Sequence, residues 1–344
     1  MIVSTVLCNT NIFFLNKRLK IFINYFLGPV LFIWLSFSIY HQIQQQQNLQ
    51  HTWQTIIHSF KAKQWMLLLL VILLMFINWG LEAVKWQYLM RNIQTVSFGK
   101  AFKAIFAGQA FAFNTVNNVG EYLGRMFFLD EGNRLRSISL TMVGSLSQLI
   151  VTFVMGIAGL FYMRWFMLDA ASIKLHGLSL FWLQGLTVIL IAVTIVLLLL
   201  YYALAWCIKV VEKIPFVSKY IYLIQKIEEL HSKQLTKILL LSFIRYVVFV
   251  IQYLLLLNVF NVEGSSISFL WLVCVKFLVL AVIPSIAMAE LGLRGEIGMQ
   301  LFGLLSNNLI GIIFTTVGIW FINRMLPAVV GALLILSVRI FKNR

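Results

Sequence analysis

Charged side chains are scarce in this chain of 344 residues, and acidic ones are the scarcest. Asp, Glu, Lys and Arg together make up 11%, whereas a soluble domain carries about a quarter. Hydrophobic residues make up 61%, so we expect a membrane protein with several spans and no large soluble domain. The formal net charge of +16 then indicates basic cytoplasmic loops and contacts with anionic lipid headgroups, and it does not indicate nucleic-acid binding.

Cysteine and histidine are also few, which argues against the usual disulfide and metal frameworks. Cys8, Cys207 and Cys274 are scattered, and the five histidines fall in predicted loops without the spacing of metal ligands. The sequence lacks a phosphate-binding glycine loop, a nucleophile elbow and a pair of catalytic carboxylates. We therefore expect neither an enzyme nor a bound metal or cofactor.

Long apolar runs predict an all-α polytopic membrane protein with about six full spans. The runs cover residues 21–40, 65–81, 138–163, 178–208, 238–260 and 311–338. Basic residues precede the first run and follow the last, which predicts that both termini are cytoplasmic. Residues 1–20 are then a cytoplasmic lead, and residues 21–344 form a single transmembrane domain of an inner-membrane protein.

Two further apolar segments are interrupted by related motifs, at residues 120–125 and 290–296. Each motif has a carboxylate four residues before an arginine, with glycine between or beside them. Residues 104–119 would form a helix of about 24 Å, shorter than the ~30 Å hydrocarbon core. We expect two re-entrant hairpins that enter from opposite sides, as in an inverted repeat with halves at about residues 64–177 and 238–338. The alternative is eight ordinary spans with polar kinks.

The charged side chains of the two motifs are candidates for binding a headgroup. Arg125 and Arg294 carry guanidinium forks suited to phosphate or carboxylate. Nearby glutamates are expected to orient these arginines or to bind a cationic headgroup, and the alternative is that each Glu–Arg pair only pins its hairpin. The motif glycines, among them Gly120 and Gly124, are expected to allow turns with positive φ. The full candidate set is Asn117, Asn118, Glu121, Arg125, Lys276, Glu290, Arg294, Glu296 and Arg324.

Arg324 lies deep in the last predicted span, roughly 21 Å from either end. An intramembrane arginine is by default a candidate functional residue, and we expect its partner to be Glu290 or Glu296. Pro327 and Gly331 follow it and are expected to kink or open the helix.

Three more charged positions fall at the ends of apolar segments or inside them. Glu82 and Lys85 are spaced to pair along one helical face. Arg245 is expected to snorkel back to the cytoplasmic face, and Lys276 has two readings, buried in the protein or extended to the interface.

At its motifs the chain resembles the transmembrane region of the lysylphosphatidylglycerol synthetase family, whose members are also described as flippase-like. The segments that carry the resemblance are Gly120-Glu121 with Arg125, Leu291-Gly292-Leu293-Arg294-Gly295-Glu296, and Arg324 with Pro327 and Gly331. The resemblance covers about residues 20–340. It implies lipid translocation rather than aminoacylation, because 344 residues are expected to leave no room for the soluble transferase domain of full-length members.

The expected function is therefore to bind a phospholipid or lipid-linked headgroup and flip it across the inner membrane. The expected partners are membrane lipids with anionic headgroups. Two alternatives remain at this point: a secondary transporter of a small anion, and a membrane scaffold whose basic loop, residues 209–237, docks a separate lipid-modifying synthase.

Overall fold

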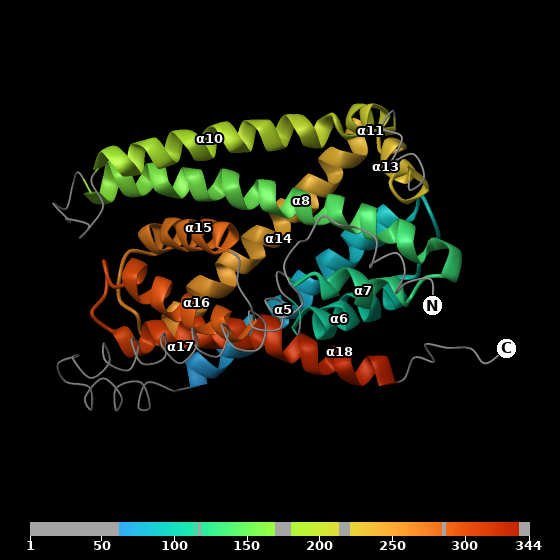
Figure 1. Cartoon of the computed structure of the whole chain (residues 1–344). Helices are drawn as coiled ribbons and strands as arrows, with labels where there is room; N and C mark the ends of the chain where they lie inside the picture. The colour runs from blue at the N-terminus through green and yellow to red at the C-terminus, as the bar shows by residue number, and fades with distance from the viewer. Residues whose placement is uncertain are drawn as a thin grey trace, which may run out of the picture.

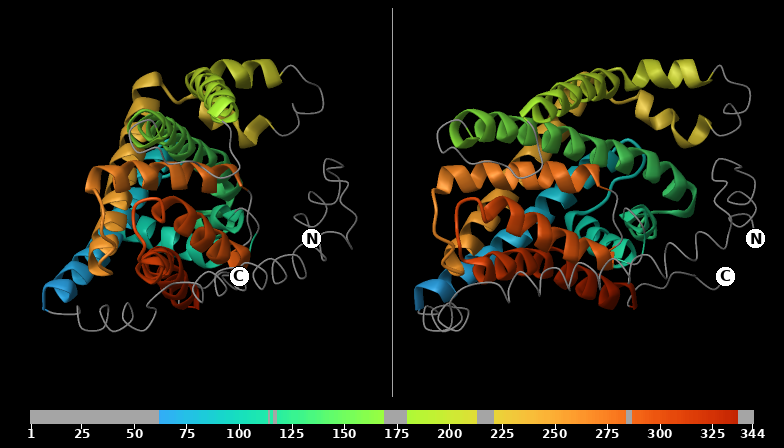
Figure 2. Two further views of the ribbon diagram at one scale, coloured as in Figure 1. Left: turned by 90° about the vertical axis from the view of Figure 1, so that its left-hand side faces the viewer. Right: turned by 60° about the vertical axis from the view of Figure 1, so that its left-hand side comes forward.

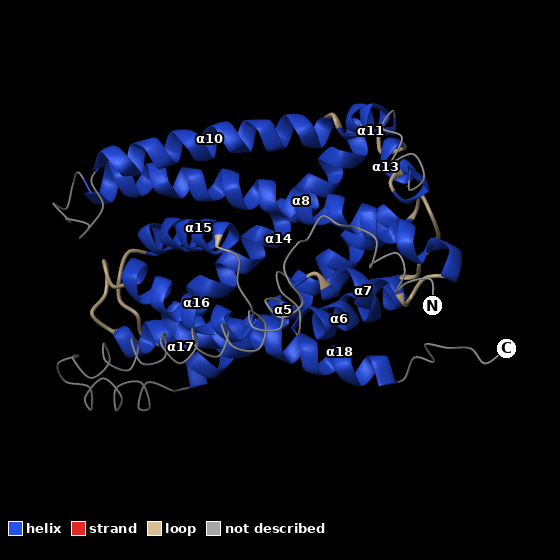
Figure 3. Cartoon of the chain, viewed as in Figure 1, coloured by secondary structure: helices blue, strands red, loops and turns tan. Residues whose placement is uncertain are grey.

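The described part of the chain consists of helices and the turns between them (Figure 3). The computed structural model describes residues 62–113, 115, 118–168, 180–212, 221–283 and 287–336. In the N-terminal half the helices are α5 (Ala62–Met90), α6 (Phe98–Phe113), α7 (Gly120–Met126), α8 (Glu131–Tyr162), α10 (Leu180–Tyr202) and α11 (Leu204–Glu212). The C-terminal half contains α13 (Gln225–Glu228), α14 (Ser232–Val259), α15 (Ser266–Val282), α16 (Ala287–Phe302), α17 (Leu309–Trp320) and α18 (Leu326–Leu336).

Among the described residues, five helical stretches are long and apolar enough to cross a membrane. They cover Gln64–Met90, Glu131–Met167, Gln184–Tyr202, Ser232–Val259 and Leu309–Ile335. The prediction of an all-α polytopic membrane protein is confirmed, and these stretches correspond to five of the six predicted spans. The remaining predicted span, residues 21–40, and the predicted lead at residues 1–20 lie outside the described residues.

The predicted span over residues 178–208 ends earlier than expected. α10 stops at Tyr202, and the chain begins the separate helix α11 at Leu204. The 23 residues of α10 reach about 34 Å, which is already enough to cross the hydrocarbon core. α11 also brings in Lys209 and Glu212, charged residues that belong at or beyond the membrane surface.

Two pairs of shorter helices lie among the long ones. α6 has 16 residues and packs against α7, which has 7, while α15 and α16 have 17 and 16 residues and pack against each other. A helix of 17 residues reaches about 26 Å, and one of 7 residues only about 10 Å. These lengths fit re-entrant hairpins better than additional spans. Along the length of α8 and α10 the two hairpins occupy opposite halves of the molecule, α6–α7 at the right and α15–α16 at the left of Figure 1 (see also Figure 2).

Close helix packing in the first hairpin depends on glycine. A Cβ on Gly124 would lie 2.6 Å from the carbonyl oxygen of Ala107, and one on Gly120 would lie 2.2 Å from that of Phe111. Both glycines are therefore needed for the close approach of α7 to α6. The predicted role in a positive-φ turn is wrong for them, since the positive φ in this turn belongs to Asn118, at 59°.

Gly331 produces the tightest contact between the two halves of the chain. It lies on α18, which packs along α6, and a Cβ at this position would lie 1.8 Å from the carbonyl oxygen of Phe106. The helix does open beside Arg324, as expected, in a π turn over Phe321–Met325. This turn lies before Gly331 and ends where α18 begins, at Leu326 and Pro327. Gly331 itself is a packing position.

Replacing Gly331 with alanine is expected to separate α18 from α6 and to destabilise the protein by about 1–3 kcal/mol, the usual cost of overpacking. Gly185 on α10 is the matched control, because nothing lies within 4 Å of a Cβ added there. Gly185→Ala is expected to be neutral or to stabilise by up to about 1 kcal/mol, since alanine favours helix. Thermal unfolding in detergent measures both, and equal melting temperatures for the two variants would contradict the contact.

Candidate functional site

The carboxylate of Glu82 lies at the centre of a buried group of charges. Its side chain is 6% exposed and pairs with Lys85 at 2.8 Å on the same helix, α5. It also pairs with Arg125 of α7 at 3.0 Å and with Arg245 of α14 at 2.9 Å. The predicted Glu82–Lys85 pair is thus confirmed, and it is part of a larger cluster that joins three helices.

Polar groups from neighbouring helices complete this cluster. The Lys85 ammonium donates to the carbonyl oxygen of Gly144 on α8 at 3.2 Å and to the Ser242 hydroxyl on α14 at 3.3 Å. Arg245 donates from Nε to the Asn78 side-chain oxygen at 2.7 Å. The prediction that Arg245 snorkels to the cytoplasmic face is wrong, because a buried carboxylate and amide are nearer acceptors for its guanidinium than surface water.

Arg125 connects the cluster to the first sequence motif. Besides Glu82 it contacts Glu121, one helical turn earlier on α7, so the expected orientation of Arg125 by Glu121 is confirmed. The Glu121 side chain is 21% exposed and is the more accessible of the two carboxylates. We use the name Glu82 cluster for the charged set of Glu82, Lys85, Glu121, Arg125 and Arg245.

The Glu82 cluster holds one positive charge in excess, because three cations face two carboxylates. Two buried donors have no hydrogen-bond acceptor among the described residues: the Nε of Arg125 in the cluster, and the Nδ2 of Asn78, whose side-chain oxygen accepts from Arg245. A buried donor without an acceptor costs roughly 1–3 kcal/mol, so it marks a place where an acceptor-rich ligand would be stabilised.

The turn between α6 and α7 positions Arg125. The backbone N–H of Gly120, the first residue of α7, donates to the Thr115 hydroxyl at 2.8 Å. Asn118 takes the left-handed conformation just before it, which asparagine tolerates better than most residues. Asn118 is half-buried at this tip, whereas Asn117 lies outside the described residues.

Arg324 brings the C-terminal half of the chain to the same hairpin. Its Nη1 donates to the side-chain oxygen of Gln109, a buried residue of α6, at 3.1 Å. The preceding residue, Gly108, contacts Arg125, whose Cγ would lie 3.0 Å from an added Cβ. Adjacent residues of α6 therefore contact arginines from opposite halves of the sequence.

The second motif lies on α16, and Arg294 and Glu296 are both half-buried there. The Glu296 carboxylate accepts a hydrogen bond from Gln300 at 3.2 Å. The side chain of Glu290 lies outside the described residues. The expected pairing of Arg324 with Glu290 or Glu296 stays a prediction.

Lys276 of α15 is buried, with 1% of its surface exposed, and so it does not extend to the interface. Its Nζ lies 2.5 Å from the hydroxyl of Tyr253 and 3.0 Å from that of Thr316. Among the candidates whose side chains the structure describes, Lys276 is enclosed by hydroxyl and aromatic side chains, those of Tyr253, Thr316 and Phe302.

Sequence reasoning identifies Arg125 and Arg324 as site residues but leaves out Arg245, Glu82 and Gln109. Glu82 directly follows the apolar run 65–81, and a carboxylate at that place is a usable signal for a buried partner such as Arg125. Gln109 is an uncharged residue in a short apolar helix. Its sequence context gives no sign that it accepts a hydrogen bond from Arg324, which lies 215 positions later in the chain.

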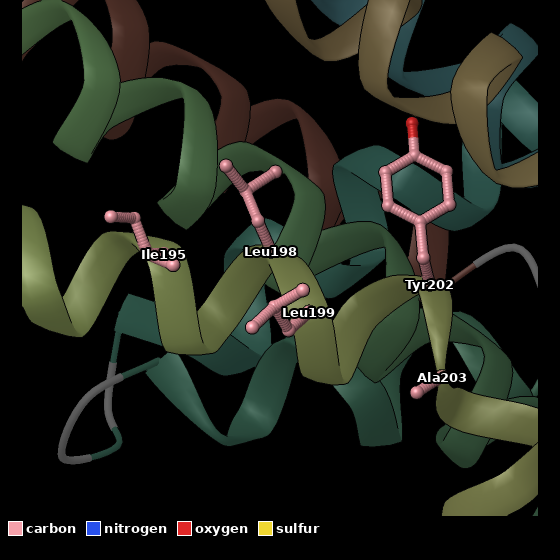
Figure 4. Close-up of a pocket in the computed structure, with 5 residues that line it drawn as sticks. All are labelled: Ile195, Leu198, Leu199, Tyr202 and Ala203. Atoms are coloured by element: carbon pink, nitrogen blue, oxygen red, sulfur yellow. The ribbon is translucent and has the colours of Figure 1, made fainter.

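A shallow depression on the surface of α10 is unrelated to these charges (Figure 4). It is lined by Ile195, Leu198, Leu199, Tyr202 and Ala203. Much of α10 presents large apolar side chains outward, as expected for a helix that faces lipid. The depression therefore fits an acyl chain better than a headgroup.

The spans, the hairpins and the buried charges together define a polytopic helical membrane protein with a polar centre. The family model described as the lysylphosphatidylglycerol synthase TM region matches residues 21–331, and the chain belongs to this family. The resemblance seen in the motifs is thereby confirmed. The family implies a membrane protein of lipid-related processes, and this region is a membrane domain that is often non-catalytic. No curated protein matches the chain.

Replacing Glu82 with glutamine is expected to destabilise the protein by about 3–5 kcal/mol, because two buried cations, Lys85 and Arg125, and the partly buried Arg245 lose their shared carboxylate. Glu229→Gln is the control, since Glu229 forms an exposed pair with Lys226 whose contribution is about 0–1 kcal/mol. The measurement is the melting temperature in detergent at neutral pH. A Glu82→Gln protein as stable as the control would show that the Glu82 cluster contributes little to the fold.

Proposed function

We propose that this protein binds lipids through an anionic headgroup at the Glu82 cluster and translocates them across the inner membrane. The observation that carries the proposal is the excess positive charge of the cluster, together with the unsatisfied donors of Arg125 and Asn78. A phosphate brings negative charge and several acceptor oxygens, which is what these groups lack.

Glu121 is the group that a headgroup would displace. It is more exposed than Glu82 and contacts one cation in the cluster, whereas Glu82 contacts three. A phosphate oxygen that replaced the Glu121 carboxylate at Arg125 would keep that guanidinium paired throughout. Exchange of one acceptor for another lowers the desolvation cost of admitting the headgroup, since no buried cation is left uncompensated.

The passage for the headgroup would run between the two hairpins. Arg324 and Gln109 join the last span to α6, close to the contact between α6 and Arg125. Arg294 and Glu296 on α16 supply charge to the opposite hairpin, and we extend the proposed path to Glu290, Asn117 and Asn118 on the strength of the motifs. The acyl chains would remain in the bilayer, next to apolar helices such as α10.

The distribution of basic residues supports an orientation in which the end of the molecule that carries α11, α13 and the start of α8 faces the cytoplasm. α11, α13 and the start of α8 lie together at the right of Figure 1. Basic residues on these helices and at the start of α6 include Lys100, Lys103, Arg134, Arg136, Lys209 and Lys226. By the positive-inside rule this end is cytoplasmic, in keeping with cytoplasmic termini in an inner-membrane protein.

The test uses vesicles that contain the purified protein and a fluorescent anionic phospholipid whose exposure is measured by quenching from outside. Arg125→Gln and Arg324→Gln are expected to slow transbilayer movement at least about tenfold, because each removes a charge that would bind phosphate. Arg91→Gln is the control, since Arg91 is exposed and outside the cluster.

Melting temperatures are recorded for the same preparations, so that a folding defect is not mistaken for lost transport. Wild-type rates in both folded arginine variants would refute the proposal. Uptake of a labelled soluble anion without lipid movement would instead assign the site to the transport of a small anion.

A further inference from the structure

Lys276 is buried in the C-terminal half together with two hydroxyl groups. Its Nζ, the Tyr253 oxygen and the Thr316 oxygen form a closed triangle, in which the two hydroxyl oxygens are 2.9 Å apart. The three side chains come from α15, α14 and α17. No carboxylate among the described residues pairs with the Lys276 nitrogen, which distinguishes it from Lys85 in the Glu82 cluster.

α16 lies against this triangle at Gly298. A Cβ added to Gly298 would lie 2.8 Å from the Lys276 nitrogen and 2.8 Å from the Thr316 oxygen. On this side, the space between α16 and the triangle is too small for a methyl group, and so for a phosphate or a chloride ion. Without a rearrangement of the helices, the number of protons is what can change at this site.

The triangle can be satisfied with the lysine charged or neutral. As an ammonium, Lys276 donates to both oxygens, and its charge faces the rings of Tyr253 at 5.0 Å and Phe302 at 5.2 Å. As a neutral amine, it accepts from the Tyr253 hydroxyl and donates to Thr316, whose hydroxyl donates back to the Tyr253 oxygen. Each form makes three hydrogen bonds within the triangle, so neither leaves the nitrogen isolated.

The charged groups around Lys276 oppose a permanent ammonium. Arg294 lies on α16, the helix that packs against α15 beside Lys276, and it is also a cation. The facing residues on α14 and α17 are Tyr253 and Thr316, and α8 packs against α15 through Gly156 and Gly159. A buried positive charge is costly without a counter-ion, and a second cation adds to that cost.

We propose that Lys276 binds and releases one proton and couples proton movement to lipid translocation, an inference that rests on the proposed function. Binding forms one N–H bond at the amine lone pair and breaks one O–H bond of a hydronium ion. No covalent bond of the protein breaks, and the hydrogen bond between Lys276 and Tyr253 reverses its direction, with the ammonium now donating. The proton comes from water on one side of the membrane and leaves to water on the other. Gly298 of α16 lies against the Lys276 nitrogen. A change in the charge of that nitrogen therefore acts directly on α16, the helix that carries Arg294 and Glu296.

The first experiment measures the proton itself and needs no transport. Thermal unfolding of detergent-purified wild type, Lys276→Met and Lys233→Met is followed from about pH 6 to about pH 10, below the ordinary titration of lysine in an unfolded chain. Lys233 is an exposed lysine on α14 and serves as the control. Other titrating groups are common to all three proteins and cancel in the differences.

In the pH range where Lys276 is neutral in the folded protein but protonated in the unfolded chain, unfolding of wild type takes up one proton. The folding equilibrium constant of wild type, divided by that of Lys276→Met, then rises about tenfold for each unit of increase in pH. We therefore expect the melting temperature of wild type to rise relative to Lys276→Met as pH increases, and the Lys233→Met difference to stay constant. A constant Lys276→Met difference across the range would overturn the proton site.

The second experiment tests the coupling in vesicles that contain the protein and the labelled phospholipid. A pH difference of about one unit across the membrane is expected to change the wild-type rate several-fold and to leave the Lys276→Met rate insensitive to the gradient. Equal wild-type rates with and without the gradient would overturn the coupling. Absence of any lipid movement would refute the proposed function, while the unfolding experiment would still decide whether Lys276 exchanges a proton.

Discussion

The pairing of one buried carboxylate with three cations is the interaction on which the centre of this protein depends. Glu82 is held on α5, and its partners come from α5 itself, α7 and α14. Each cation would be expensive to bury alone, and none can leave without exposing the others. The carboxylate thus fixes the position of a short helix, α7, that has only seven residues of its own and is too short to be stable by propensity.

The same arrangement distinguishes an enclosed carboxylate from a more accessible one. Glu82 is shared among cations and almost fully enclosed, whereas Glu121 is partly exposed and contacts a cation that already has another partner. Two acidic residues on one arginine can therefore serve different purposes. The alternative is that Glu–Arg pairs only hold the hairpin in place. The Glu82–Arg125 pair fits this description, although Glu82 lies outside the motif at residues 120–125.

The helical class and five of the spans follow from apolar run length, because the hydrocarbon core sets how many residues a crossing needs. The short helices α6, α7, α15 and α16 also lie where the interrupted apolar segments predict them. The detailed charge pairing does not follow from apolar run length. Arg245 pairs with Glu82, 163 positions earlier in the chain, and a local rule such as snorkelling takes no account of an acceptor supplied by another helix. Gln109 and Gly298 are similar cases, since their importance arises from what packs against them and leaves no mark in their own sequence context.

The contact of Gly331 with the backbone of Phe106 has a mechanical consequence. With so little space between them, the backbones of α18 and α6 cannot slide past each other without first separating. A rigid shift of α6 toward α18 would therefore have to displace the end of the last span, and the π turn at Phe321–Met325 is the place between α17 and α18 where the regular helix is already interrupted. This contact thus couples the position of a helix from the first half of the chain to that of the last described helix.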